Sequence, residues 1–538
     1  MDELSFRELS GFSRLFHDFL QNDEILMKRY PSNDLIDNPA SLKSRMKFPK
    51  NAGLISECIE RSMSAIRFDE KQYDNLRIVS NEPYLTVITG QQVGFLGGPY
   101  YTQLKAASVT ALADKLNDSA SDLNIVPLFW VEDNDHDNLE ASLIHLFDKD
   151  ASICSINCGE HIPKNDRTIV DGHFFNNNIA DILTEVRNML PDSIYKMEIF
   201  ERLQSIYTPG KSWADAFIEF MQQMFGHNGL LFVKASEVRK AGLFKDGALN
   251  ELETPCGSAG LIEEANVKLK KDGYHIQARC FDINLFYVED GYRHNIEYKG
   301  GMYHTAGMKL KREEIMEICE SNPEKFAPKV LLRPVFQDSI FPNAAYVGGP
   351  SEIGYVAQVK ELYDKFSVDM PAFVPRHSAT LISNYTAKVL ERINQFPSFF
   401  FDDPMLIENK LKHSLISFEL ASDMEDAEKQ VMKAFKSLSL LTFKIDKNLE
   451  ATARATEHKI KKLFDRYRRK TYAAVKKKNN SLFADYNYCS RMIYPNETLS
   501  ERLISPLNYI NEAGLDFFKK ALDGITSRDP DKHYIIEL

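Results

Sequence analysis

The chain has 538 residues, of which 43% are hydrophobic and 27% are charged. This balance is that of a folded globular protein and excludes the disordered, collagenous and fibrous classes. Its 77 acidic residues outnumber the 66 basic ones, and the net charge of -11 disfavours nucleic acid and anionic membrane surfaces as partners.

The sequence shows no membrane or secretion signal. No stretch approaches about eighteen uninterrupted apolar residues, and the N-terminal MDELSFRELSGF is acidic where a signal peptide would be basic. Seven cysteines, an odd number spread over a long chain, indicate reduced thiols. Cys154 and Cys158 lack a second pair that would complete a zinc site, so two buried thiols are predicted there and no zinc site. We therefore expect a cytoplasmic protein with no membrane and no nucleic-acid partner.

The first 80 residues show helical spacing, and a βαβ unit follows. Residues 84–90 are β-branched and end at glycine, residues 101–116 carry apolar positions at helical spacing, and residues 124–132 form a continuous apolar run. The last pattern is typical of a strand that is buried on both faces. The unit predicts a parallel sheet, with any ligand beyond the carboxyl ends of its strands.

Later segments extend the same sheet. Residues 229–235, 343–349 and 371–375 are predicted strands, and residues 213–225 and 354–366 are predicted helices. The intervening segments resemble inserted subdomains. From about residue 402 the apolar residues recur at three and four, which predicts two long helices or a coiled-coil hairpin. The predicted divisions are 1–138, 139–205 (inserted), 206–239, 240–330 (inserted), 331–400 and the C-terminal helical region 401–538.

A glycine-rich loop, TGQQVGFLGGPYYTQLK, joins the first strand to its helix at Thr89–Lys105. Backbone N–H groups at a helix start can hold a carboxylate or a phosphate, and Lys105 would add a positive charge. The spacing fits neither the dinucleotide-binding glycine pattern nor the Walker sequence. A turn that merely joins strand to helix is the alternative, but the adjacent amides of Gln91 and Gln92 favour ligand binding.

An acidic motif, WVEDNDHD, lies at Trp130–Asp137 on the same predicted sheet edge. Its carboxylates and His136 could bind a hard metal ion or form a histidine–carboxylate pair for proton transfer. The alternative is a solvated loop that caps the following helix. Its position beside the glycine loop favours a functional role.

Three further motifs, LLRPVFQD (331–338), YVGGPSEIGY (346–355) and PRHSAT (375–380), carry cations and a glycine turn. Arg333 suits a forked contact to a carboxylate, and Glu352 could bind an amine or complement a helix dipole. Single arginines such as Arg333 and Arg376 are more often salt-bridge partners, and His377 is more often a satisfied histidine. Their repeated placement at predicted strand ends is the argument for function.

In their order along the chain, these motifs resemble the cysteine ligases of bacillithiol biosynthesis, the BshC family. The resemblance runs nearly end to end. It implies an α/β fold with a Rossmann-like parallel-sheet core, inserted connecting-peptide subdomains and a C-terminal α-helical coiled coil used for homodimerisation. One departure is Leu104, since many members have histidine before the lysine of the first motif; a nucleotidyltransferase-type histidine signature is therefore not supported.

The resemblance also implies the reaction and its participants. L-cysteine would be joined through its carboxylate to the amine of glucosaminyl malate; the activating cofactor is undetermined, with ATP or another nucleotide as candidates. Asp135, His136 and Asp137 are the implied catalytic residues. The implied substrate-binding residues are Thr89, Gln91, Gln92, Gly97, Gly98, Pro99, Tyr101, Lys105, Trp130, Arg333, Gln337, Asp338, Gly348, Gly349, Glu352, Tyr355 and Arg376.

Two alternatives remain open at this stage. One is a ligase of the same fold that uses another amine acceptor. The other is a non-catalytic nucleotide-binding scaffold whose coiled coil recruits a partner. Each catalytic interpretation requires the stretches near Thr89, Trp130 and Arg333 to converge on one polar crevice.

Overall fold

The computed structural model describes residues 2–32, 34–163, 166–415 and 418–538. The chain divides into two compact units. The first comprises Met1–Ser383 together with Thr498–Leu538, and the second comprises Asn384–Glu497.

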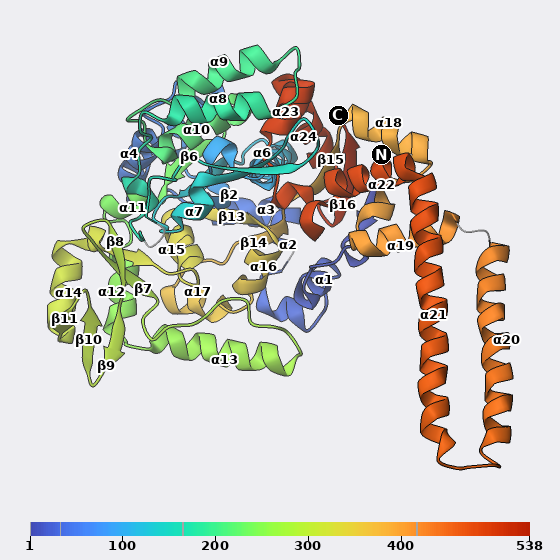
Figure 1. Ribbon diagram of the computed structural model, residues 1–538. Helices are drawn as coiled ribbons and strands as arrows, with labels where there is room; N and C mark the ends of the chain where they lie inside the picture. The colour runs from blue at the N-terminus through green and yellow to red at the C-terminus, as the bar shows by residue number, and fades with distance from the viewer. Residues whose placement is uncertain (1, 33, 164–165, 416–417) are drawn as a thin grey trace. The chain divides into compact units, whose positions relative to one another are not determined.

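A five-stranded parallel sheet forms the centre of the first unit (Figure 1). Its strand order is β14 (Ala372–Pro375), β13 (Asn343–Gly348), β2 (Leu85–Gln92), β3 (Ile125–Glu132), β6 (Leu231–Lys234). The first seven residues of β3 are buried, which confirms the strand predicted from its uninterrupted apolar run. The Rossmann-like α/β core is therefore confirmed.

Helices cover this sheet and place its loops. Helix α6 (Tyr101–Ser119) follows the glycine loop and contacts β2 and β3, as the predicted βαβ unit requires. Helix α10 (Trp213–Phe225) matches the predicted helix. The predicted helix over 354–366 is instead two helices, α16 (Pro350–Val356) and α17 (Lys360–Phe366).

Small antiparallel sheets occupy the two predicted insertions. In the first, β4 (Leu143–Phe147) pairs with β5 (Ile153–Asn157), and helices α8 (Ile179–Met189) and α9 (Lys196–Ile206) follow. In the second, β7 (Leu285–Glu289) lies between β12 (Phe326–Pro328) and β8 (Tyr292–Asn295). Three short strands and three helices complete it: β9 (Glu297–Lys299), β10 (Met302–Thr305), β11 (Met308–Leu310), α12 (Lys245–Glu253), α13 (Gly257–Lys271) and α14 (Arg312–Ser321).

The second unit contains the predicted pair of long helices. Helix α20 (Phe418–Thr442) and helix α21 (Leu449–Lys478) contact each other as a hairpin. Helices α18 (Asn384–Ile393), α19 (Pro404–Leu415) and α22 (Asn480–Ile493) complete this unit. The predicted coiled-coil architecture is confirmed.

The last 41 residues of the chain, Thr498–Leu538, lie in the first unit, so the boundary differs from the predicted region 401–538. Strand β16 (Lys532–Glu537) lies between β1 (Asp2–Ser5) and β15 (Ser378–Ile382). The physical reason is burial, because four consecutive β16 residues, 533–536, are inaccessible to solvent in that sheet.

Among the described residues, no helix has the length and apolar character needed to cross a membrane. All seven cysteines are unpaired, three of them being partly or fully accessible and four buried.

Candidate active site

A cavity of about 410 Å³ opens at the carboxyl ends of β2, β3, β13 and β14. The stretches near Thr89, Trp130 and Arg333 do converge here. The cavity is lined by Gly90, Gln91, Gln92, Tyr101, Lys105, Trp130, Glu132, Arg333, Gly349, Pro350, Ser351, Glu352, Tyr355, Arg376 and Arg502. Four of these side chains are cationic and two are carboxylates, so the cavity suits anionic groups.

Lys105 lies one turn into α6, where it is 3% exposed. Its Nζ lies 2.5 Å from Oε2 of Glu352 and donates to the carbonyl of Gly90 at 2.7 Å and to Oε1 of Gln91 at 3.0 Å. Burial lowers the pKa of Lys105, and the Glu352 charge opposes that shift. The ammonium is therefore held in place by three acceptors from two parts of the chain, the end of β2 and the start of α16.

Glu352 is positioned by the glycine turn that precedes α16. Its carboxylate accepts from the backbone N–H of Gly349 at 2.7 Å and from the Tyr346 hydroxyl at 2.6 Å. Burial acts to raise its pKa, but the Lys105 ammonium and these hydrogen bonds outweigh burial and lower it. Glu352 is thus an ionised carboxylate, and it both caps α16 and pairs with Lys105.

Arg333 is the first residue of α15 (Arg333–Ile340), so its predicted position at a strand end is wrong. Its guanidinium donates to Tyr355 Oη at 2.9 Å, to Tyr346 Oη at 3.4 Å and to Gln337 Oε1 at 2.9 Å. All three acceptors are neutral, and no described residue forms a direct ion pair that would cancel the positive charge of Arg333. Gln337 acts here as a buried support for Arg333 and does not line the cavity.

Arg376 follows β14, as predicted. Its Nη2 lies 2.6 Å from Oε1 of Glu501, and its Nη1 donates to the carbonyl of His377 at 2.8 Å. The next residue in the chain after Glu501 is Arg502, which also lines the cavity. Among the described residues, the Arg502 side chain has no hydrogen bond or ion pair. His377 is buried and satisfied by Ser108 and by the carbonyl of Arg528.

Glu132 ends β3, directly opposite Gln92 in the sheet register. Its Oε2 accepts from the indole N–H of Trp130 at 3.0 Å, and no ion pair to Glu132 is present among the described residues. Burial raises its pKa. A carboxylate of this kind is suited to accept a proton.

Asp135 and His136 lie beside the cavity rather than in its lining. Arg293 on β8 contacts the Asp135 carboxylate and Nδ1 of His136, and Gln92 Nε2 also donates to Asp135. Burial acts to raise the pKa of Asp135, but the contacts from His136, Arg293 and Gln92 outweigh burial and lower it. Asp135 is therefore a firmly ionised group that ties the loop after β3 to the second insertion.

Asp137 serves as the N-cap of α7 (Asn138–Ser142). Its side chain accepts from the backbone N–H of Glu140 at 3.0 Å. The capping alternative considered for this acidic loop therefore accounts for Asp137, which does not line the cavity.

The glycine loop faces the protein interior. Gly97 and Gly98 have φ values of +82° and +65°, and a side chain on Gly97 would collide with Phe220 of α10. Gly97, Gly98 and Pro99 do not line the cavity, and neither do Thr89 and Gly348. Thr89 is buried and donates to the carbonyl of Val347 at 2.8 Å. The two ends of the loop therefore line the cavity with Gly90, Gln91, Gln92, Tyr101 and Lys105, whereas its central glycines and Pro99 do not.

Asp338 lies behind the cavity, in the core. It accepts from Tyr363 at 2.7 Å, Asn343 at 3.0 Å and Gln337 at 3.1 Å. Burial raises the pKa of Asp338 to about 6. These contacts assign it a structural position rather than the predicted contact with substrate.

The sequence motifs missed three residues that build the site. Glu132 was considered among the carboxylates of the acidic motif but was not one of the implied catalytic residues. Arg293, Glu501 and Arg502 come from segments without any motif, and only the three-dimensional fold brings them here. Within the described residues, no group of three histidine, cysteine or acidic side chains could hold a metal ion.

Comparisons with known proteins cover the whole chain. Residues 1–377 match the family model described as "Bacillithiol biosynthesis BshC, N-terminal Rossmann-like domain", and residues 379–538 match its "C-terminal coiled-coil domain". Three similar curated proteins are each named "Putative cysteine ligase BshC". The protein from Chlorobaculum tepidum is 29% identical, with 98% of this chain and 97% of the relative covered. Those from Salinibacter ruber and Cytophaga hutchinsonii are each 27% identical, with 96% of this chain and 96% and 95% of the relatives covered.

Proposed function

Because the chain belongs to the BshC family of bacillithiol biosynthesis, we propose that it is a ligase that joins the carboxylate of L-cysteine to the amine of glucosaminyl malate. The observation that carries this proposal is the charge of the cavity. Lys105, Arg333, Arg376 and Arg502 meet there beside Glu132, a carboxylate without an ion pair. The malyl part of the acceptor has two carboxylates and cysteine has one, so the substrates match these cations.

The reaction forms one C–N bond and removes one carboxylate oxygen from cysteine. That oxygen is a poor leaving group until a phosphoryl or nucleotidyl group is attached to it. The amine nitrogen then attacks the carbonyl carbon, loses a proton, and the activating group departs with the oxygen. ATP or another nucleotide is the candidate activating co-substrate, and the ionised Lys105 supports its binding as a phosphate contact.

Glu132 is the best-placed residue to accept the proton from the attacking amine. It lines the cavity, and burial raises its pKa toward the range in which a general base works. Asp135 and His136, the catalytic residues implied by the family resemblance, lie on the loop that follows Glu132 at the end of β3, and they are proposed to orient the amine. Asp137 is left in its capping role.

The test is a product assay with the purified full-length chain, L-cysteine, glucosaminyl malate and one nucleotide at a time. Mass spectrometry should detect the condensation product with a single nucleotide. The variant Glu132→Gln should lose about 100-fold in kcat, whereas Glu289→Gln, an exposed glutamate of β7, should keep wild-type activity. Product with a different amine only would indicate another acceptor. Thermal stabilisation by nucleotide without any product would indicate a nucleotide-binding scaffold.

We also propose that the α20–α21 hairpin forms a homodimer. Its surface carries exposed apolar side chains at helical spacing, a pattern expected where a second helix pair is bound. These are Val431, Leu438, Leu441, Leu449, Leu463 and Tyr467. Replacement of Leu438 and Leu463 by glutamate should convert a dimer to a monomer in light scattering.

The seven unpaired thiols support a cytoplasmic location, the reducing compartment we propose for this protein.

A further inference from the structure

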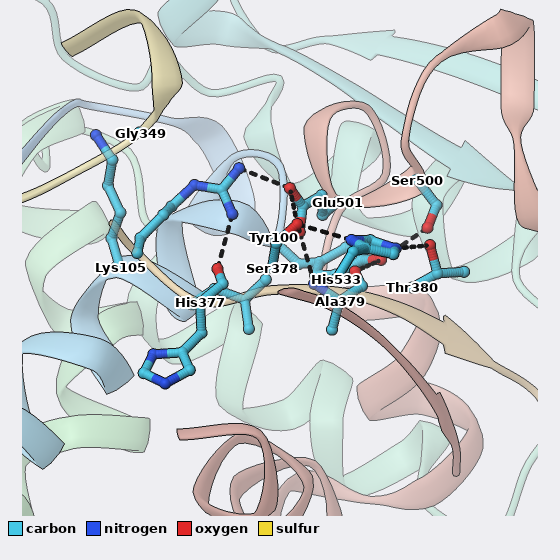
Figure 2. A network of polar contacts seen from close by, with 12 residues as sticks. Tyr100, Lys105, Gly349, His377, Ser378, Ala379, Thr380, Ser500, Glu501 and His533 are labelled. Carbon is cyan, nitrogen blue, oxygen red and sulfur yellow. Dashed lines mark hydrogen bonds and ion pairs between the residues drawn. The ribbon is translucent and has the colours of Figure 1, made fainter. Parts of the chain in front are cut away.

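Glu501 is a buried carboxylate that joins the C-terminal segment to the cavity. It lies in the short helix η9 (Ser500–Arg502) and is 1% exposed. One oxygen contacts the Arg376 guanidinium at 2.6 Å, and the pair is among the most deeply buried ion pairs of the described residues, with side chains 5% and 1% exposed. Figure 2 shows Glu501 beside Ser378, Ala379 and His533.

We propose that Glu501 is a positioning residue of the active site. Its carboxylate fixes the guanidinium of Arg376, and the adjacent backbone brings Arg502 to the same cavity. The two arginines together then bind the carboxylates of the acceptor. This inference rests on the proposed function and names the residues that select a dicarboxylate acceptor. The contacts of Glu501 are the first argument for it.

Both oxygens of Glu501 are held from the side opposite Arg376. The Ser378 hydroxyl lies 2.9 Å from each oxygen, and the backbone N–H of Ala379 donates to Oε2 at 2.8 Å. Ser378 in turn contacts Nδ1 of His533 at 2.8 Å, and Thr380 contacts Nε2 of the same ring at 2.9 Å. The carboxylate therefore has one position, set by β15 and β16, and Arg376 must orient toward it.

Electrostatics supply the second argument. Arg376 and Arg502 line one cavity, so their positive charges repel each other. Burial and this repulsion lower the pKa of Arg502. Glu501 offsets part of this repulsion from the protein side. A compensating carboxylate behind two guanidinium groups allows both to remain charged and close enough for one ligand.

The hydrogen-bonding capacity of Arg376 is the third argument. A guanidinium has five N–H donors. One N–H of Arg376 Nη2 donates to Glu501, and one N–H of Nη1 donates to the His377 carbonyl. The remaining donors, with those of the unpaired Arg502, match the oxygens of two neighbouring carboxylates. A dicarboxylate would satisfy both arginines, while a monocarboxylate would satisfy one.

The experiment is a double-mutant cycle on the full-length chain, with variants Arg376→Gln, Glu501→Gln and the double variant. Calorimetric affinity for glucosaminyl malate and KM for each substrate are measured. We expect Glu501→Gln to weaken acceptor binding about tenfold with an unchanged KM for cysteine. We also expect it to have no further effect in the Arg376→Gln background, because the two residues act as one unit.

Glu251→Gln is the matched control, because Glu251 is also a buried carboxylate held by a serine hydroxyl and a backbone N–H, from Ser258 and Asn284, and it contacts neither arginine. It should lower stability and leave the acceptor affinity at the wild-type value. If Glu501→Gln fails to fold, the double variant removes both buried charges together and should recover stability while keeping the weak affinity.

The outcomes separate this inference from the proposed function. Wild-type binding of glucosaminyl malate without any ligated product would refute the ligase, and the binding cycle would still test Glu501. Equal acceptor affinity in wild type and a folded Glu501→Gln variant, or additive effects in the cycle, would overturn the role of Glu501. A loss of affinity in Glu251→Gln equal to that in Glu501→Gln would also overturn it.

Discussion

The Nζ of Lys105 lies 2.5 Å from the carboxylate of Glu352, in a pair that joins the helix after β2 to the helix after β13. The pair thus connects two helix starts that are almost 250 residues apart in sequence, on one side of the cavity. The pair is mostly buried, with side chains 4% and 17% exposed. Both its stability and its function can be tested by substitution.

Lys105→Met should lower the free energy of unfolding by about 3 kcal/mol, because it leaves Glu352 charged and unpaired in a buried place. Urea denaturation measures this change. The double variant Lys105→Met/Glu352→Gln should recover most of the lost stability but should remain inactive. Equal stability of wild type and the single variant would show that the pair is not formed in solution.

Arg293→Met should reduce kcat about 100-fold with little change in the KM for cysteine. Arg293 holds Asp135 and His136 from the second insertion, and its loss frees the loop that follows β3. Steady-state kinetics checks this. Lys325→Met, which breaks the half-buried pair between Lys325 and Glu289 of β7, is the control and should keep the wild-type kcat. An unaltered kcat in Arg293→Met would remove Asp135 and His136 from the mechanism.

The pH dependence of stability should report on His533. Burial lowers its pKa to about 4 from an ordinary value of 6.5, so the unfolded chain binds the proton more tightly than the folded chain. Stability is fully present above pH 6.5 and is lost as the pH falls toward 4. Over that window wild type should lose up to about 3 kcal/mol more than His533→Asn. Parallel stability curves for the two proteins would contradict this expectation.

Asp338→Asn should leave the KM of both substrates within about twofold of wild type, because Asp338 lies in the core behind the cavity. In the folded protein the pKa of Asp338 is about 6, above the ordinary 3.8, so folding favours the protonated carboxyl group. The stabilisation that this protonation contributes to the folded state is lost as the pH rises from about 4 to 6. The asparagine variant should show no such loss in chemical denaturation. Arg333→Met, which alters the cavity wall, should raise the acceptor KM about tenfold; a similar rise in Asp338→Asn would return Asp338 to the binding site.

The sequence predicted those parts of the fold that have local patterns. Strand β2 begins as a β-branched run that ends at glycine, β3 is a continuous apolar run, and α6 between them has helical spacing. The βαβ unit and the sheet edge that carries Lys105 could therefore be predicted directly. The long helices α20 and α21 were predicted for the same reason.

Other parts depend on long-range contacts. β16 pairs with β1 across more than 500 residues, and no local pattern encodes that register. The segment with Glu501 and Arg502 was therefore assigned to the helical region. On α15, Arg333 and Gln337 share a face at a spacing of four, while Asp338, one residue further, points into the core. A motif read as consecutive letters could not separate these two directions.

The placement of β16 between β1 and β15 has a consequence during synthesis. The ribosome makes the sheet, the glycine turn and the first three cations of the cavity long before it reaches Glu501, Arg502 and the strand that holds them. A nascent chain arrested anywhere before Lys532 lacks the ring that braces Ser378 and the strand that closes its sheet. Truncated chains without β16 should therefore be catalytically silent, because the sheet that carries Ser378 would stay incomplete.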